Sequence, residues 1–159
     1  MRRDLIALPD DSKVWVYQSD KVISDEKTES IMSSLYDFTM QWASHGHELD
    51  SYANVFHYRF IVVVADGSHL PSGCSIDASV HMIEDLGQQY GLQLFDRMQF
   101  AYMLDDQIFS MQSSDLPLAY KEGRITDDTL FFNNLVKTKA AFLEEWIIPL
   151  KDSWHTRFL

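Results

Sequence analysis

Six consecutive apolar residues, Phe60 to Ala65, constrain the fold more than any other feature of this 159-residue chain. They end a segment, 55–65, in which alternate residues would point to opposite sides of a sheet. Its first half is partly polar and its second half wholly apolar, which predicts one strand that enters the centre of a sheet. One face would carry Phe56, Tyr58, Phe60, Val62 and Val64, and the other Val55, His57, Arg59, Ile61 and Val63. The apolar run is far shorter than the roughly 20 residues of a membrane-spanning helix, so the sequence predicts no membrane span.

Two amphipathic helices are predicted, one before this strand in the chain and one after it. Ser24 caps the first, whose apolar stripe at 31, 35, 38 and 42 is followed by a stop at Gly46. The second carries apolar residues at 76, 80, 83 and 90 and ends at Gly91. A short β-branched and aromatic strand at 14–17 precedes both helices.

The second half of the chain has a different pattern. Residues 98–104 alternate, Asp105 and Asp106 make a turn, and a returning strand begins at 108. A short helix near 116–121, a brief strand around 130–132 and a last helix over 136–147, stopped by Pro149, complete the chain. This succession predicts an α+β fold with a mixed or antiparallel sheet and helices packed on one face. We expect a single domain over 1–159, with a soft subdivision into 1–93 and 94–159.

Charge and cysteine content narrow the classes of partner and compartment. The chain has 13 basic and 24 acidic residues, a formal net charge of −11, which disfavours nucleic acid as a partner. The lone cysteine, Cys74, cannot form an internal disulfide, and the first nine residues lack the apolar stretch of a signal peptide. We therefore expect a cytoplasmic protein.

A glycine-flanked loop at 67–77 joins the predicted central strand to the second helix, as a phosphate-binding loop does in nucleotide-hydrolysing proteins. Five residues separate Gly67 from Gly73, where that motif has four, and Cys74 takes the place of its lysine. Without that cation the sequence disfavours an ATPase, and the simplest interpretation is a turn that begins a helix. The alternative is an anion site in which Arg97 reaches the start of this helix. The candidate ligand- or anion-binding residues are Ser72, Gly73, Cys74, Ser75, Asp77 and Arg97.

Two chemical hypotheses start from single residue types. A thiol at a helix N-terminus favours nucleophilic chemistry at Cys74, whereas Asp77 one turn on opposes a thiolate and a buried structural role is the alternative. His45 and His47, followed by Glu48 and Asp50, miss the metal-hydrolase pattern twice. The sequence therefore predicts no metal and no cofactor, and it identifies no catalytic residue.

Two families resemble parts of this sequence. The first is a small bacterial family often labelled "ABC transporter ATPase", and the likeness covers nearly the whole chain. It is carried by 15–17, Trp42 with 45–46, 72–77, 95–97, 133–136 and 152–155. It implies no catalytic residues, because the P-loop lysine is missing. The second likeness covers about the last third, where 121–130 resembles the second type of GYF domain, a peptide-binding fold.

No complete catalytic or cofactor motif emerges, so the leading prediction is a non-enzymatic domain that acts through protein–protein contacts, as a binder of another protein or as a homodimer. The alternative is a small-molecule or anion-binding protein, or a thiol-dependent enzyme, centred on the loop at 67–77.

Overall fold

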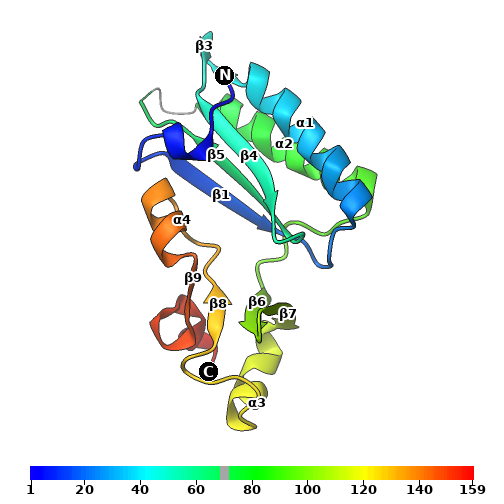
Figure 1. The fold of residues 1–159 in the computed structure, drawn as a ribbon, viewed down its shortest axis with the longest axis vertical. Coiled ribbons are helices and arrows are strands. Elements are labelled where there is room, and N and C mark those ends of the chain that lie inside the picture. The colour runs from blue at the N-terminus through cyan, green and yellow to red at the C-terminus, as the bar shows by residue number, and fades with distance from the viewer. Residues whose placement is uncertain (69–71) are drawn as a thin grey trace.

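The computed structural model describes residues 1–68 and 72–159 and has the α+β fold predicted from the sequence (Figure 1). Its two main sheets are antiparallel, one built near the N-terminus and one in the second half of the chain. None of the helices that the structure describes combines the length and the apolar character that a membrane crossing requires.

The first sheet has the strand order β1-β5-β4, from β1 (Lys13–Gln18), β5 (Phe60–Ala65) and β4 (Ser51–Phe56). β5 lies in the middle and is buried along its whole length, as its apolar run predicts. Helices α1 (Asp25–Gln41) and α2 (Gly73–Tyr90) cover one face, where Ile31, Leu35 and Ile83 pack against Ile61 and Val63 (Figure 1). β1 and β4 are left as the two edge strands.

The predicted single strand over 55–65 is wrong, because that segment is the end of β4, a tight turn and β5. Phe56 lies opposite Phe60, and the N–H of Arg59 donates to the carbonyl oxygen of Phe56. His57 and Tyr58 turn the chain in left-handed conformations, each with φ of 55°. The turn contains no glycine, proline or asparagine, the residues that usually mark a hairpin. The strand-like alternation of residues in the sequence therefore continues through the turn and does not reveal it.

The first long helix begins at its predicted cap, and the second ends at its predicted glycine. The Ser24 hydroxyl accepts from the N–H of Lys27, and α2 ends at Gly91, whose φ of 67° is left-handed. α1 stops at Gln41, short of Gly46, because the following residues form the small hairpin of β2 (Ala43–Ser44) and β3 (His47–Glu48). Gly46 serves the turn of that hairpin with φ of 80°.

The second sheet has the order β7-β6-β8-β9. Its members are β6 (Gln99–Leu104), β7 (Gln107–Gln112), β8 (Leu130–Phe132) and β9 (Ile147–Pro149), with α3 (Leu116–Lys121) between β7 and β8. The predicted hairpin at Asp105 and Asp106 is confirmed, with both residues at positive φ. The last helix, α4 (Lys139–Glu145), is shorter than predicted, because Thr138 bridges to β1 and 147–149 forms β9.

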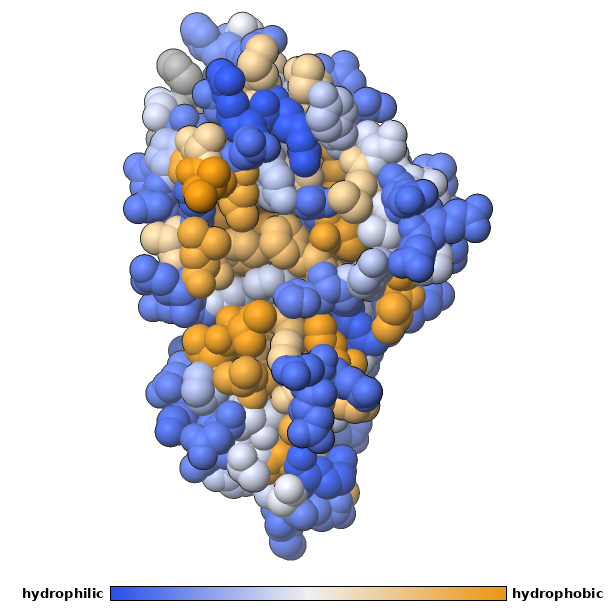
Figure 2. Space-filling model, in the orientation of Figure 1, coloured by the Kyte–Doolittle hydropathy of each residue, from blue (hydrophilic) through white to orange (hydrophobic). Residues whose placement is uncertain are grey.

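α4 packs on the face of the first sheet opposite α1 and α2, so this sheet is covered on both sides. Phe142 and Trp146 contact Phe56, with ring centroids 5.4 and 5.8 Å away, and Phe60 stacks at 4.6 Å from Phe132. On the face seen in Figure 2, apolar side chains gather over the middle of the molecule, where the two sheets meet. This shared aromatic core holds the two sheets together.

Candidate functional site

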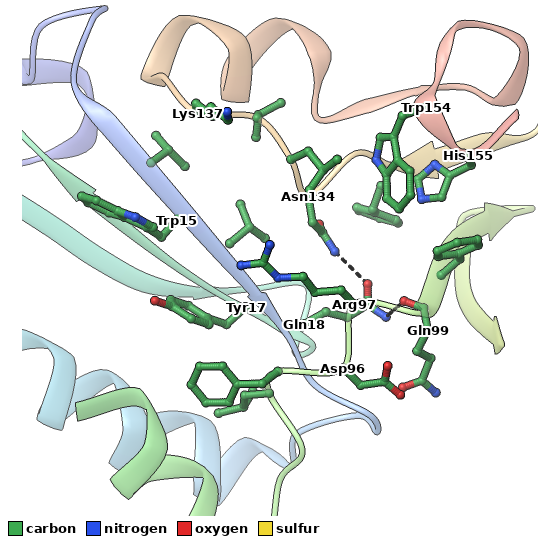
Figure 3. A pocket seen from close by; sticks show the side chains of 18 of the residues that line it. Trp15, Tyr17, Gln18, Asp96, Arg97, Gln99, Asn134, Lys137, Trp154 and His155 are labelled. Atoms are coloured by element: carbon green, nitrogen blue, oxygen red, sulfur yellow. Dashed lines mark hydrogen bonds between the residues drawn. The ribbon is translucent and has the colours of Figure 1, made fainter. Parts of the chain in front are cut away.

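A cavity of about 550 Å³ lies between β1 and the second half of the chain (Figure 3). All six residues of β1 line it, together with the connector 94–97, the start of β6, the segment 134–137, and Trp154 and His155 near the C-terminus. Its volume is in the range of cavities that bind small molecules or side chains of a partner.

The cavity runs along the free edge of β1. Consecutive strand residues point to opposite faces, so a hollow that touches all six must follow the edge of the strand. Trp15 and Tyr17 belong to the helix-covered face, and Val14 and Val16 to the face covered by α4. β1 pairs with β5 on one side, and on the other the described residues give it one backbone bridge, Lys13 to Thr138.

At both ends of the cavity, hydrogen bonds tie β1 to neighbouring segments of the chain. At one end the N–H of Val14 donates to the carbonyl oxygen of Lys137 at 3.0 Å. At the other the buried side chain of Gln18 donates to the Gln99 carbonyl at 3.0 Å and accepts from the Asn134 amide at 2.9 Å (Figure 3). Between these ties β1 and the segment 134–137 are separated by the cavity.

Aromatic side chains form much of the wall. Tyr17 meets the exposed ring of Phe95 edge-on, with centroids 5.5 Å apart, and Trp15 meets Trp42 at 6.3 Å. Burial raises the pKa of the Tyr17 hydroxyl, and the positive charge of Arg97 opposes that rise, which places Arg97 within electrostatic reach of this ring. The wall therefore offers apolar surface next to a cation.

Positive charge is concentrated at this cavity. Three of the 13 basic residues of the chain line it, Lys13, Arg97 and Lys137, against one of the 24 acidic residues, Asp96. Figure 3 shows the side chain of Arg97 reaching from the connector across the cavity towards β1. Among the described residues, none of these three cations has a carboxylate within ion-pair distance.

His155 and Trp154 close the far side. His155 is buried, and desolvation lowers its pKa to about 4, so the ring is neutral near pH 7. Its Nδ1 lies 2.5 Å from the Ser153 hydroxyl, and its ring stacks on Trp154 with centroids 4.2 Å apart. The buried indole N–H of Trp154 has no acceptor among the described residues.

The structure separates the predicted site residues. Arg97 lines the cavity with Ile76 from the first turn of α2, whereas the other five predicted residues do not line it. Ser72 caps α2, and the carbonyl oxygen of the buried Ser75 accepts from the Trp42 indole at 2.9 Å. The remaining three, Gly73, Cys74 and Asp77, are exposed. His69–Pro71 of the predicted loop lie outside the described residues, and the thiol and anion-cradle hypotheses for this loop stay predictions.

Sequence reasoning did not identify the residues that accompany Arg97. Lys13, Trp15 and Tyr17 are two residues apart and therefore share one face of a strand. A cation on the same face as two large aromatic side chains was a local signal of a binding surface. Lys137 and Asn134 gave no such signal, because only the fold brings them beside β1. Within the described part of the chain, no three His, Cys, Asp or Glu side chains are grouped so as to hold a metal ion.

Comparison with known protein families, with curated proteins and with solved structures finds no match for this chain. The two family resemblances therefore stay predictions, and the function has to be argued from the cavity.

Proposed function

We propose that this chain is a binding protein whose cavity beside β1 receives an anionic ligand with an apolar or aromatic body. The observation that carries the proposal is the grouping of Lys13, Arg97 and Lys137, without carboxylate partners among the described residues, around an aromatic-walled cavity. A chain of net charge −11 repels anions in general, so a local excess of cations favours anion recognition at this place.

Each group has a defined part in such binding. The Arg97 guanidinium would donate two parallel hydrogen bonds to a carboxylate, sulfonate or phosphate. Lys13 and Lys137 would add charge at the rim, and the rings of Trp15 and Tyr17 would cover the apolar body of the ligand. The neutral His155 adds no charge near pH 7, which leaves the three cations to select for an anion.

This proposal keeps the predicted binding role and moves the anion site from the loop at 67–77 to the β1 cavity. The location we propose is cytoplasmic, supported by the single cysteine, and nucleic acid stays disfavoured by the charge of −11. Action through protein contacts stays our proposal for how the bound state is used.

The test is a fluorescence titration with anilinonaphthalene sulfonate, an anionic aromatic dye, beside the neutral dye Nile red. We expect the sulfonate to bind and Arg97→Gln to weaken it by about tenfold or more, because a charge-assisted hydrogen bond contributes about 1.5–3 kcal/mol. Nile red binding should stay within a factor of about two, because the change leaves the apolar wall in place.

Arg124→Gln is the matched control. Arg124 is exposed and paired with Glu122 at 2.8 Å, and it does not line the cavity, so its loss should leave sulfonate binding unchanged. Absence of sulfonate binding, or equal weakening by the two arginine variants, would contradict the proposal.

A further inference from the structure

We infer that the anion bound in this cavity is carried by an extended acidic polypeptide segment of a partner protein, which adds to the first sheet as a strand along the free edge of β1. The inference rests on the proposed function and names the class of ligand. It depends on three features of β1: its unpaired backbone, the length of its open edge and the charge beside it.

Backbone groups of β1 face the cavity. The N–H of Val14 points away from β5, since it donates to Lys137, and the N–H of Ser19 points towards β5, since it donates to Arg59. Alternation along the strand then directs the N–H and C=O of Val16 away from β5, into the open stretch between the two ties. An edge strand with unpaired N–H and C=O groups is the template on which peptide-binding domains add a strand.

The open edge has the length of a short segment. It extends from the bridge at Lys13 to the side-chain tie at Gln18, which is about 16 Å at roughly 3.3 Å per residue. Three or four extended residues fit within this distance. Between its two bonds to β1, the segment 134–137 does not pair with the edge, because Asn133 accepts the N–H groups of Leu135 and Val136.

Charge selects the kind of segment. Lys13 shares a face of β1 with Trp15 and Tyr17, and Arg97 acts electrostatically on Tyr17 from the same side. Acidic side chains of an added strand would meet these cations on that face. The opposite face is apolar, formed by Val14 and Val16 with aromatic residues of the second sheet. The complementary sequence therefore alternates acidic and apolar residues.

The test uses calorimetric titration with an acetylated and amidated peptide of sequence Glu, Val, Glu. We expect it to bind, to slow amide hydrogen exchange at Val16, and to compete with anilinonaphthalene sulfonate. The same peptide with lysine for glutamate should not bind. N-methylation of one of the two sets of amides, valine or glutamate, should weaken binding by about tenfold or more, and N-methylation of the other set should not, because only alternate amides of an added strand pair with β1.

Two variants of one residue separate backbone pairing from side-chain packing. Val16→Pro removes the outward N–H without breaking the ladder to β5, since proline is tolerated where an edge N–H faces outward. It should weaken the peptide by about tenfold or more and still bind the sulfonate dye. Val16→Ala keeps the N–H and should change peptide affinity by less than about threefold. A cooperative urea-unfolding transition like that of the parent chain shows that the proline variant is folded, because the dye alone also binds partly unfolded chains.

The outcomes divide as follows. Dye binding without peptide binding would overturn this inference and leave the proposed function standing, whereas loss of both would overturn both. Equal peptide affinity for Val16→Pro and the parent chain would overturn strand addition. A dimer in sedimentation that Val16→Pro abolishes would also overturn the inference, because the edge would then belong to a second copy of this chain.

Discussion

The buried ring of His155 should make the stability of this protein depend on pH in a defined window. Desolvation lowers its pKa to about 4 in the folded chain, against the ordinary value of 6.5 for a histidine in water. As the pH falls below about 6.5, His155 becomes protonated in the unfolded chain but stays neutral in the folded chain. The free energy of unfolding therefore falls as the pH falls. The loss stops growing once the pH is below the folded pKa of about 4.

The size of the effect follows from the gap between the two pKa values. A gap of about 2.5 units at 1.36 kcal/mol per unit corresponds to about 3 kcal/mol in full, of which about 2 kcal/mol is expressed between about pH 7 and pH 4.5. The pKa of His57 is also lowered by burial, with the same sign, so a single pH series does not isolate His155.

The assay is urea unfolding of the parent chain and of His155→Gln at both pH values. Glutamine does not titrate and offers polar atoms to Ser153, and its constant packing cost cancels when the two pH values are subtracted. We expect the parent to lose about 2 kcal/mol more than the variant on going to the lower pH. Equal losses in the two proteins would refute the reasoning that His155 is buried in its neutral form.

Three further predictions concern helix α2 with its C-cap and the hydrogen bonds of Gln18, and urea unfolding measures each. Gly87→Ala should cost about 1–3 kcal/mol, because its new Cβ would lie 2.9 Å from a backbone oxygen, whereas Gly91→Ala meets nothing and should cost about 1 kcal/mol for its left-handed φ. A larger cost for Gly91→Ala would contradict this ranking. Ser72→Ala should cost about 1 kcal/mol as a lost cap, while the exposed Cys74→Ala should stay within about 0.5 kcal/mol. Gln18→Leu should cost about 1–3 kcal/mol, because it leaves the half-buried amide of Asn134 and the carbonyl of Gln99 unpaired, and a neutral result would show that these hydrogen bonds are dispensable.

Features encoded by neighbouring residues were predictable from the sequence. Ser24 and Gly91 bound their helices because a side-chain cap and a left-handed glycine act on the adjacent turn. The turn at Asp105 and Asp106 was marked by the alternating segments that flank it. The turn at His57 and Tyr58 was not, because it contains no glycine, proline or asparagine and the strands on both sides continue the same alternation.

The candidate site was only partly predictable, because it depends on contacts between distant parts of the chain. Arg97 could be named as an anion ligand, but its partners were sought at the start of α2, which is nearer in sequence than β1. Lys13 and Lys137 reach the same cavity through one bridge between segments over 120 residues apart, which local pattern does not encode. The sequence could indicate one positively charged candidate residue, whereas the location of the candidate site required the fold.

The buried amine of Lys139 gives the molecule a particular order of assembly. It donates to the carbonyl oxygens of Ile6 and Leu8, so residues 6–8 are held by a segment that is made more than 120 residues later. Met1 and Arg3 bond to Ser51 of β4, so during translation only residues 6–8 of the N-terminal arm lack their partner until α4 has been made. Because α4 also covers the sheet beside β1, the edge strand stays exposed until α4 has been made. During this interval the nascent chain is most vulnerable to wrong pairing at the edge of β1, which is the surface that we propose for recognition.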